Sequence, residues 1–298
     1  MRIGNAPVSW GIFELEGVST DLPYGRVMDE IAASGYEGTE LGPWGYFPTD
    51  PATLAGELSR RRLALASAFC PVDLIDASGY EEAEAHTLEV ARLLRQLGTT
   101  DVVLADRWRP QRATVAGRAT NADGLSPRGW DTMSRGLNRL GARLAAEGMR
   151  AVFHHHVATY VETEDEIDHL LSSTDPTLIG LCLDTGHAAF GGVDPVRLLE
   201  RWRDRVRYVH LKDVNPAVLV SVTQARLDYD GCIRAGVFCP LGSGQVNFLA
   251  IFSGLHDAGY EGWLIVEQDV IVGDLGKPAS AIDAAKQSRA FLRSMVGM

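Results

Sequence analysis

Histidine or carboxylate side chains follow four short apolar runs in the second half of the chain: His154 and His156, then Asp184, His210 and Glu267. Imidazole and carboxylate groups are the ligands that divalent ions of intermediate hardness use in proteins. If the runs are neighbouring parallel strands, their ends lie at one edge of a sheet and these side chains can converge. The spacing therefore predicts a metalloenzyme with a divalent-ion site.

Three consecutive histidines follow Phe153, and they cannot all face the same way. Side chains alternate along a strand, so His154 and His156 point to one side and His155 to the other, toward a helix layer. We therefore expect a structural role for His155. Either His154 or His156 can supply the metal ligand from this strand.

Other titratable side chains are placed to act as acids or bases. Lys212 lies two residues after His210 and so faces the same pocket, where a bound cation could lower its pKa. The alternative for Lys212 is a surface lysine paired with Asp213. His187, one turn after Asp184, and His156 are further candidates. Glu40 ends another apolar run and is predicted to reach the pocket from the opposite wall, as an acid/base, as an acceptor for a substrate hydroxyl, or merely in an inter-strand ion pair.

Composition excludes several classes of protein. The 298 residues carry a net charge of −11 with no basic stripe, which disfavours nucleic acid or an anionic membrane as the partner. No apolar run approaches the roughly 20 residues of a membrane span, and the first residues lack the apolar core of a signal peptide. Four cysteines without a Cys-x-x-Cys pair indicate free thiols. We expect a cytoplasmic enzyme acting on a small molecule.

The elements that must position these residues are eight apolar runs separated by helical periodicity. The runs are continuous rather than alternating, which indicates strands buried on both faces of a parallel sheet. Eight such units predict an α/β fold, one (βα)₈ TIM barrel over residues 1–298. A doubly wound sheet is disfavoured because no Gly-x-Gly-x-x-Gly turn follows an early strand. The runs lie near residues 2–10, 37–42, 63–70, 101–106, 150–156, 179–184, 206–211 and 262–268.

Two connections are longer than a barrel requires. Residues 107–128 and 213–245 follow the fourth and seventh runs. In a barrel these connections lie at the carboxyl ends of the strands, where active sites are built. We expect both to be walls or lids of a pocket, the alternative being exposed decorations.

The order of several motifs resembles a known family. The motifs are Asp184-Thr185-Gly-His187, Val209-His210-Leu-Lys212-Asp213, Leu241-Gly-x-Gly244-x-Val-x-Phe248 and Glu267. This order resembles that of the xylose isomerase-like barrels, which include sugar isomerases, 3-epimerases, inosose-processing enzymes and the endonuclease IV branch. Residues 5–11, 35–45 and 154–163 resemble the inosose (2-keto-myo-inositol) dehydratases in particular.

The resemblance implies a ligand set and a reaction. Carried over, the metal ligands are His154, Asp184, His210 and Glu267, with Mn²⁺ or Co²⁺ preferred and Zn²⁺, Fe²⁺ or Mg²⁺ also compatible. The implied reaction is dehydration of a cyclic polyol ketone through a metal-stabilised enediolate, in inositol catabolism. The alternative is a ketose or keto-sugar 3-epimerase or isomerase. Epimerases carry Glu where this chain has His154, which disfavours a two-carboxylate proton shuttle.

Further residues are predicted to bind the substrate. Trp10 and Trp44 end the first two runs and offer flat faces to the C–H face of a polyol ring, the alternative being core packing. Asn5, Glu162 and Asp269 are expected to hold hydroxyls or to orient ligand imidazoles. Such an enzyme is compatible with a homo-oligomer.

Overall fold

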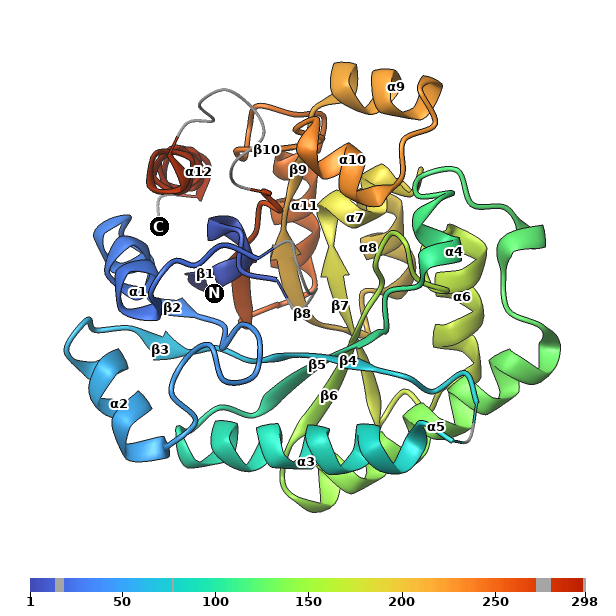
Figure 1. The fold of residues 1–298 in the computed structure, drawn as a ribbon, viewed down its shortest axis with the longest axis horizontal. Helices are drawn as coiled ribbons and strands as arrows, with labels where there is room; N and C mark the ends of the chain where they lie inside the picture. Colours follow the sequence, from blue (N-terminus) through green and yellow to red (C-terminus); the bar gives the residue numbers. More distant parts are fainter. Residues whose placement is uncertain (14–18, 77, 272–279, 297–298) are drawn as a thin grey trace.

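One parallel sheet closes on itself in the computed structural model, which describes residues 1–13, 19–76, 78–271 and 280–296. Its order is β3-β2-β1-β11-β8-β7-β6-β5-β4. Strands β3 and β4, at the two ends of this order, lie in one continuous stretch of chain. This stretch is hydrogen-bonded to both neighbours, because the Leu41 N–H just after β2 donates to Ser67 O and the Val103 N–H of β5 donates to Ala68 O. The sheet is therefore an α/β barrel (Figure 1). Its strands are β1 (Arg2–Asn5), β2 (Gly38–Thr39), β3 (Ala64–Leu65), β4 (Phe69–Val72), β5 (Asp101–Asp106), β6 (Arg150–His154), β7 (Ile179–Asp184), β8 (Val206–Leu211) and β11 (Trp263–Val266).

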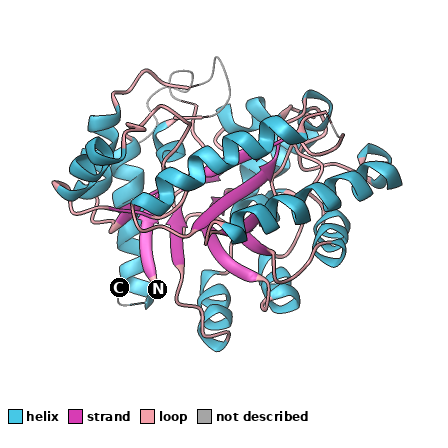
Figure 2. Cartoon of the chain, turned by 90° about the horizontal axis from the view of Figure 1, so that it is seen from below, coloured by secondary structure: helices cyan, strands magenta, loops and turns pink. Residues whose placement is uncertain are grey.

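Helices alternate with the barrel strands and enclose them (Figure 2). Their apolar faces pack on the outer face of the sheet in one large hydrophobic cluster. The start of α6 is set by the predicted capping box, in which Thr163 and Glu166 bond each other's backbone N–H. The outer helices are α1 (Tyr24–Ala33), α2 (Pro51–Ser59), α3 (Tyr80–Gln96), α5 (Pro127–Ala146), α6 (Glu164–Ser173), α8 (Pro195–Trp202), α11 (Phe248–Asp257) and α12 (Ala281–Val296).

The predicted (βα)₈ architecture is confirmed, and each of the eight apolar runs contains a barrel strand. The first run is shorter than predicted. Strand β1 ends at Asn5, and Pro7–Trp10 form a 3₁₀ helix, η1. Proline lacks the N–H that a strand ladder needs and has a fixed φ that suits the first turn of a helix. Trp10 consequently lies in the core rather than at the end of a strand.

Side-chain alternation inside the barrel places the polar residues. A small apolar cluster fills the interior one layer before the carboxyl ends of the strands, and it includes Val152, Cys182, Tyr208 and Ile265. Side chains two positions apart on a strand face the same way. The next inward-facing residues toward the carboxyl ends are therefore His154, Asp184, His210 and Glu267. The apolar layer thus supports a polar layer directly above it.

The two long connections fold together beside the barrel mouth (Figure 1). A second hydrophobic cluster joins them, with Ala113 and Ala116 from residues 107–128 and Tyr229 and Ile233 from residues 213–245. Their elements are α4 (Pro110–Ala113), η2 (Asn121–Asp123), β9 (Asp213–Val214), α9 (Pro216–Gln224), α10 (Tyr229–Arg234) and β10 (Phe238–Cys239), and the short α7 (Thr185–Phe190) packs against β9.

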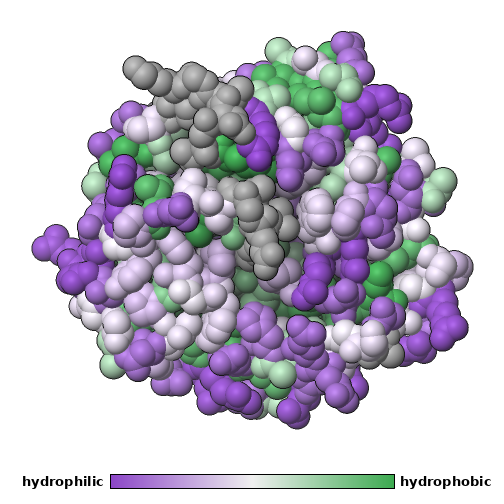
Figure 3. All heavy atoms as spheres, in the orientation of Figure 1, coloured by the Kyte–Doolittle hydropathy of each residue, from purple (hydrophilic) through white to green (hydrophobic). Residues whose placement is uncertain are grey.

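Apolar side chains are exposed near these connections. Hydrophobic side chains gather at the top of Figure 3, in the region of α9, where Val220 is 57% exposed. Within the described residues, no helix has the length and apolar character needed to cross a membrane. The four cysteines are buried free thiols.

Candidate metal centre and cavity

A cavity of about 400 Å³ opens at the carboxyl ends of the barrel strands. This volume lies within the range of ~300–1,000 Å³ that is usual for small-molecule sites. Polar side chains form its floor, and apolar side chains form much of its wall. The polar lining includes Glu40, His154, His156, His210, Lys212, Glu267 and Asp269, and the wall includes Val8, Ile12, Phe13, Phe69, Pro71, Trp108 and Tyr229.

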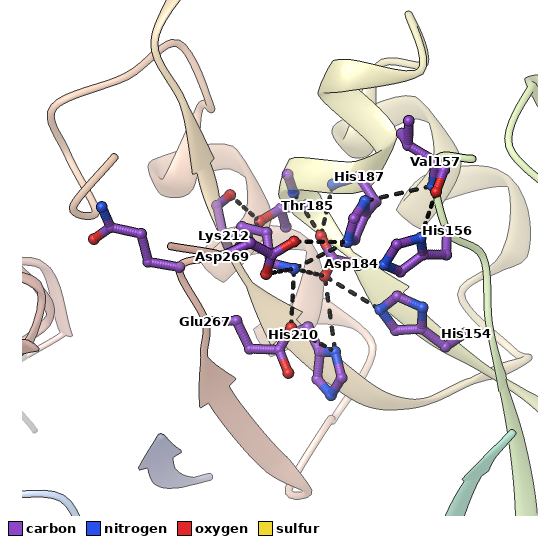
Figure 4. Close-up of polar contacts among 12 residues, drawn as sticks. His154, His156, Val157, Asp184, Thr185, His187, His210, Lys212, Glu267 and Asp269 are labelled. Carbon is purple, nitrogen blue, oxygen red and sulfur yellow. Dashed lines mark hydrogen bonds and ion pairs between the residues drawn. The ribbon is translucent and has the colours of Figure 1, made fainter. Parts of the chain in front are cut away.

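The four ligands implied by the family resemblance lie together at the floor. Candidate ligand atoms of His154, Asp184, His210 and Glu267 are all within 4.8 Å of one another, and all four residues are buried. His154 Nε2 is 3.2 Å from Asp184 Oδ2. His210 Nδ1 is 3.4 Å from Glu267 Oε2 (Figure 4). Two imidazoles and two carboxylates therefore converge on one point from four neighbouring strands.

The residues present fit a divalent ion. The buried Nδ1 of His210 has no hydrogen-bond partner. It lies 3.7 Å from Asp184 Oδ2, and the opposite nitrogen, Nε2, is 3.1 Å from Glu40 Oε1. A histidine that binds a metal through one ring nitrogen usually donates its other N–H to a carboxylate or another acceptor, and the contact of His210 Nε2 with Glu40 fits that arrangement. Glu40 is thus placed to orient His210, which matches the ion-pair alternative for this residue.

His154 and His156 occupy different positions. His156 Nδ1–H donates to the carbonyl of Val157, so its Nε2 keeps a lone pair and faces the Tyr229 hydroxyl at 3.5 Å. His156 belongs to a second group of ligand-type atoms, with His187 and Asp269. The structure therefore brings His154, rather than His156, against Asp184 and His210.

Burial controls the charge of these imidazoles. Desolvation lowers the pKa of His154 to about 4 and that of His156 to about 3, so both rings are neutral near neutral pH. Burial also acts to lower the pKa of His210, but Cys182, Glu267 and other acidic neighbours raise it well above its usual value. The carboxylates around His210 favour a cation at this position, and a metal ion would displace its proton.

Lys212 is buried among acidic groups at the same floor. Its Nζ lies 2.8 Å from Asp269 Oδ1, 3.0 Å from Glu267 Oε2 and 3.0 Å from His187 Nε2. Burial acts to lower the pKa of Lys212, but Asp184 and the other carboxylates raise it above the ordinary value. The sequence argument predicted a pKa lowered by a bound cation, whereas the surrounding carboxylates act in the opposite direction. His187 contacts this ammonium through Nε2 but is not among the residues that line the cavity.

Asp213 is not the partner of Lys212. Its carboxylate accepts hydrogen bonds from the backbone N–H groups of Gly242, Gly244, Val214 and Val246. A Cβ at position 244 would lie 2.3 Å from Asp213 Oδ1, so this loop requires glycine there. Asp213 therefore organises the loop between β10 and α11, a role that the sequence analysis missed although both motifs had been identified.

Replacing Asp213 with alanine is expected to lower the free energy of unfolding by about 3 kcal/mol, because one buried and three partly buried backbone donors lose their shared acceptor. Chemical denaturation measures this change. Asp50→Ala is the matched control, since Asp50 caps α2 through an exposed bond to the Thr53 N–H. A loss for Asp213→Ala no larger than that of Asp50→Ala would contradict this role.

Trp10 and Trp44, both predicted to contact the substrate, are not among the residues that line the cavity. Trp10 is buried, and its indole N–H donates to Glu30 Oε2 at 2.7 Å. Trp44 packs edge-on against His86. Both positions match the core-packing alternative.

Asn5 and Glu162 also lie outside the cavity lining. Asn5 is on the outer face of β1, near the Tyr36 hydroxyl. Glu162 accepts hydrogen bonds from the backbone N–H groups of Gly117 and Ala158. It therefore ties residues 107–128 to the chain after β6, so its support for the site is indirect. Burial raises the pKa of Glu162 to about 7.

Three cavity residues come from the long connections and were not singled out in the sequence: Arg107, Trp108 and Tyr229. Tyr229, at the start of α10, donates its hydroxyl proton to Asp269 Oδ2 at 2.8 Å. Trp108 lines the wall with a buried indole N–H that has no partner. The length of these connections predicted a wall, but no periodicity indicates which of their side chains face inward.

Comparisons with known proteins agree with this geometry. The model of the xylose isomerase-like TIM barrel family matches residues 28–295. A protein named inosose dehydratase from Geobacillus kaustophilus is 37% identical over 273 residues, which cover 90% of this chain and 87% of that protein. Another, from Geobacillus thermodenitrificans, is 32% identical over 301 residues, covering 100% of this chain and 98% of that one.

Solved structures share the fold at lower identity. A probable 3-DHS dehydratase from Bacillus anthracis has a TM-score of 0.73 at 18% identity and covers 98% of both chains. A D-psicose 3-epimerase from Clostridium cellulolyticum has a TM-score of 0.73 at 15% identity and covers 99% of both chains. The family match spans most of the sequence, and the two dehydratases align along most of their length. The chain belongs to the xylose isomerase-like TIM barrel family.

Proposed function

We propose that the protein is a metal-dependent hydro-lyase that removes water from a cyclic polyhydroxy ketone such as 2-keto-myo-inositol. The observation that carries this proposal is the convergence of two imidazoles and two carboxylates beside the Lys212 ammonium at the cavity floor. The relatives named inosose dehydratase support the choice of reaction and substrate, and a place in inositol catabolism.

Four residues would hold the ion: His154, Asp184, His210 and Glu267. When bound, a divalent ion supplies Lewis-acid stabilisation of the negative charge that develops on a ketone oxygen. The donor set is compatible with Mn²⁺ or Co²⁺. Glu40 keeps the His210 ring in the orientation that such binding requires.

His156 is the proposed base for the proton next to the ketone. Its Nδ1–H is committed to the Val157 carbonyl, and the ring lines the cavity with Nε2 unprotonated. A neutral imidazole held in one tautomer can accept a proton at the free nitrogen. The electron pair of the broken C–H bond then becomes available to the neighbouring carbon.

Lys212 is the proposed acid at the leaving hydroxyl. It lines the same cavity as an ammonium held by Glu267 and Asp269. As the C–O bond breaks, its electron pair goes to the oxygen, and a proton from the ammonium completes a molecule of water. The electron pair left by the broken C–H bond forms the new C=C bond. Dehydration needs such an acid in addition to a base.

Product analysis tests the proposed reaction against epimerisation or isomerisation. The protein loaded with Mn²⁺ or Co²⁺ is incubated with 2-keto-myo-inositol in D₂O, and the product is analysed by mass spectrometry. We expect a product that has lost one water relative to the substrate, apart from deuterium taken up at carbon from the solvent, formed only when metal is present. Deuterium uptake without loss of water would instead indicate a keto-sugar 3-epimerase or isomerase and would contradict the hydro-lyase proposal.

A further inference from the structure

A second group of ligand-type atoms lies directly beside the first. Candidate ligand atoms of His156, His187 and Asp269 are within 4.8 Å of one another. The ring centroids of His156 and His187 are 3.7 Å apart, and those of His154 and His156 are 5.5 Å apart. The carboxyl end of the barrel therefore contains two neighbouring groups of nitrogen and oxygen atoms that could each hold an ion.

A cation of the chain itself occupies the space between the two groups. Lys212 Nζ lies 2.8 Å from Asp269 Oδ1 and 3.0 Å from His187 Nε2, both in the second group. It also lies 3.0 Å from Glu267 Oε2 and 3.5 Å from Asp184 Oδ2, both in the first group (Figure 4). Three carboxylate oxygens and one imidazole nitrogen surround the ammonium, in the way that ligands surround a metal ion.

The fold is built to admit this side chain. A Cβ at Gly186 would lie 2.5 Å from Lys212 Cγ, so the glycine leaves the space through which the lysine passes. Thr185 Oγ1 donates to the Lys212 carbonyl and accepts from the Lys212 N–H, at 2.7 and 2.9 Å. The Phe238 ring lies 5.0 Å from Nζ. The lysine is therefore fixed in place from its backbone to its ammonium.

We propose that Lys212 is a built-in cation that fills the second metal position, so that the centre takes one divalent ion rather than two. Three carboxylates, Asp184, Glu267 and Asp269, contact the ammonium. One divalent ion and one ammonium balance their three negative charges. Without the ammonium, a single divalent ion leaves one buried negative charge uncompensated, which is costly, and a second divalent ion would neutralise that charge with one positive charge in excess.

The inference goes beyond the proposed reaction, because it concerns how many ions the centre holds. A lysine that serves only as a proton donor would leave the number of bound ions unchanged when it is replaced. Replacing a lysine that fills a metal position would leave that position open to a second ion. Metal stoichiometry separates these two roles without any measurement of activity.

The test compares bound Mn²⁺ per chain in the full-length wild type and in Lys212→Met, after saturation with Mn²⁺ and removal of free ion. We expect one equivalent in the wild type and two in Lys212→Met. The double variant Lys212→Met/His187→Gln should return to one equivalent, because it lacks a donor of the second group. His187→Gln alone should keep one.

A second ion in the wild type would overturn the proposal, as would a folded Lys212→Met that binds no more Mn²⁺ than the wild type. Lys212→Gln provides the same test with a polar side chain, in case the methionine variant does not fold, and native mass spectrometry counts its ions directly. The hydro-lyase proposal fails by a different result, the absence of dehydrated product from the wild type loaded with one ion.

Discussion

Asparagine in place of Asp184 is expected to abolish metal binding and activity while leaving the fold intact. Asp184 Oδ1 caps α7 by accepting the N–H groups of Gly186 and His187, at 2.8 and 2.7 Å. Oδ2 is the atom that faces His154 and His210. Asparagine keeps the capping oxygen but puts an amide nitrogen, which is not a metal ligand, in the other position. We expect metal affinity to fall by more than the ~10–100-fold typical of outer-shell changes.

The matched control is Asp194→Asn. Asp194 caps α8 in the same way, by accepting the Val196 and Arg197 N–H groups, but it does not belong to the group of candidate metal ligands. This variant should keep wild-type metal content and activity. Elemental analysis and circular dichroism on both variants provide the readout. Metal bound to Asp184→Asn at wild-type affinity would show that the ion site has been misplaced.

The second large effect is expected for His156→Gln, which should keep the metal and lower kcat by about 10²–10⁴, the usual contribution of a positioned base. Glutamine retains an N–H and a similar reach but cannot accept the substrate proton. Steady-state kinetics and metal analysis on the same sample provide the measurement, with KM reporting whether substrate binding is kept.

Loss of metal together with kcat in His156→Gln would contradict this role. It would favour His156 as the ligand from this strand, the alternative that the sequence left open. A near wild-type kcat with metal bound would exclude His156 as the base and leave Lys212 and Glu40, which also line the cavity, as the predicted acid/base residues to test.

The strand ends could be predicted because they depend on local patterns. Apolar runs marked the barrel strands, and two-residue alternation predicted that Asp184, His210, Glu267 and either His154 or His156 point inward, whereas the choice of His154 came from the family resemblance. The four candidate ligands share the inner face because each follows an inward-facing apolar residue by two positions. The predicted fold and the meeting of these four side chains follow from that register.

Other parts of the site could not be derived in this way. A change of one residue along a strand reverses the face of a side chain, so Asn5, predicted to bind substrate, lies on the outer face of β1. The 3₁₀ helix after Pro7 directs Trp10 into the core. The raised pKa of Lys212 depends on three carboxylates at the ends of two strands, β7 and β11, and Tyr229 reaches the cavity from a connection without periodicity.

The most direct test of the account is the position of the ion. Crystals of the protein grown with Mn²⁺ or Co²⁺ should show one anomalous peak per chain within roughly 2.0–2.3 Å of ligand atoms from His154, Asp184, His210 and Glu267, with the Lys212 ammonium beside it. A peak that lacks two or more of these four ligands, or no peak at a saturating concentration of either ion, would contradict the central claim that this group is a metal centre.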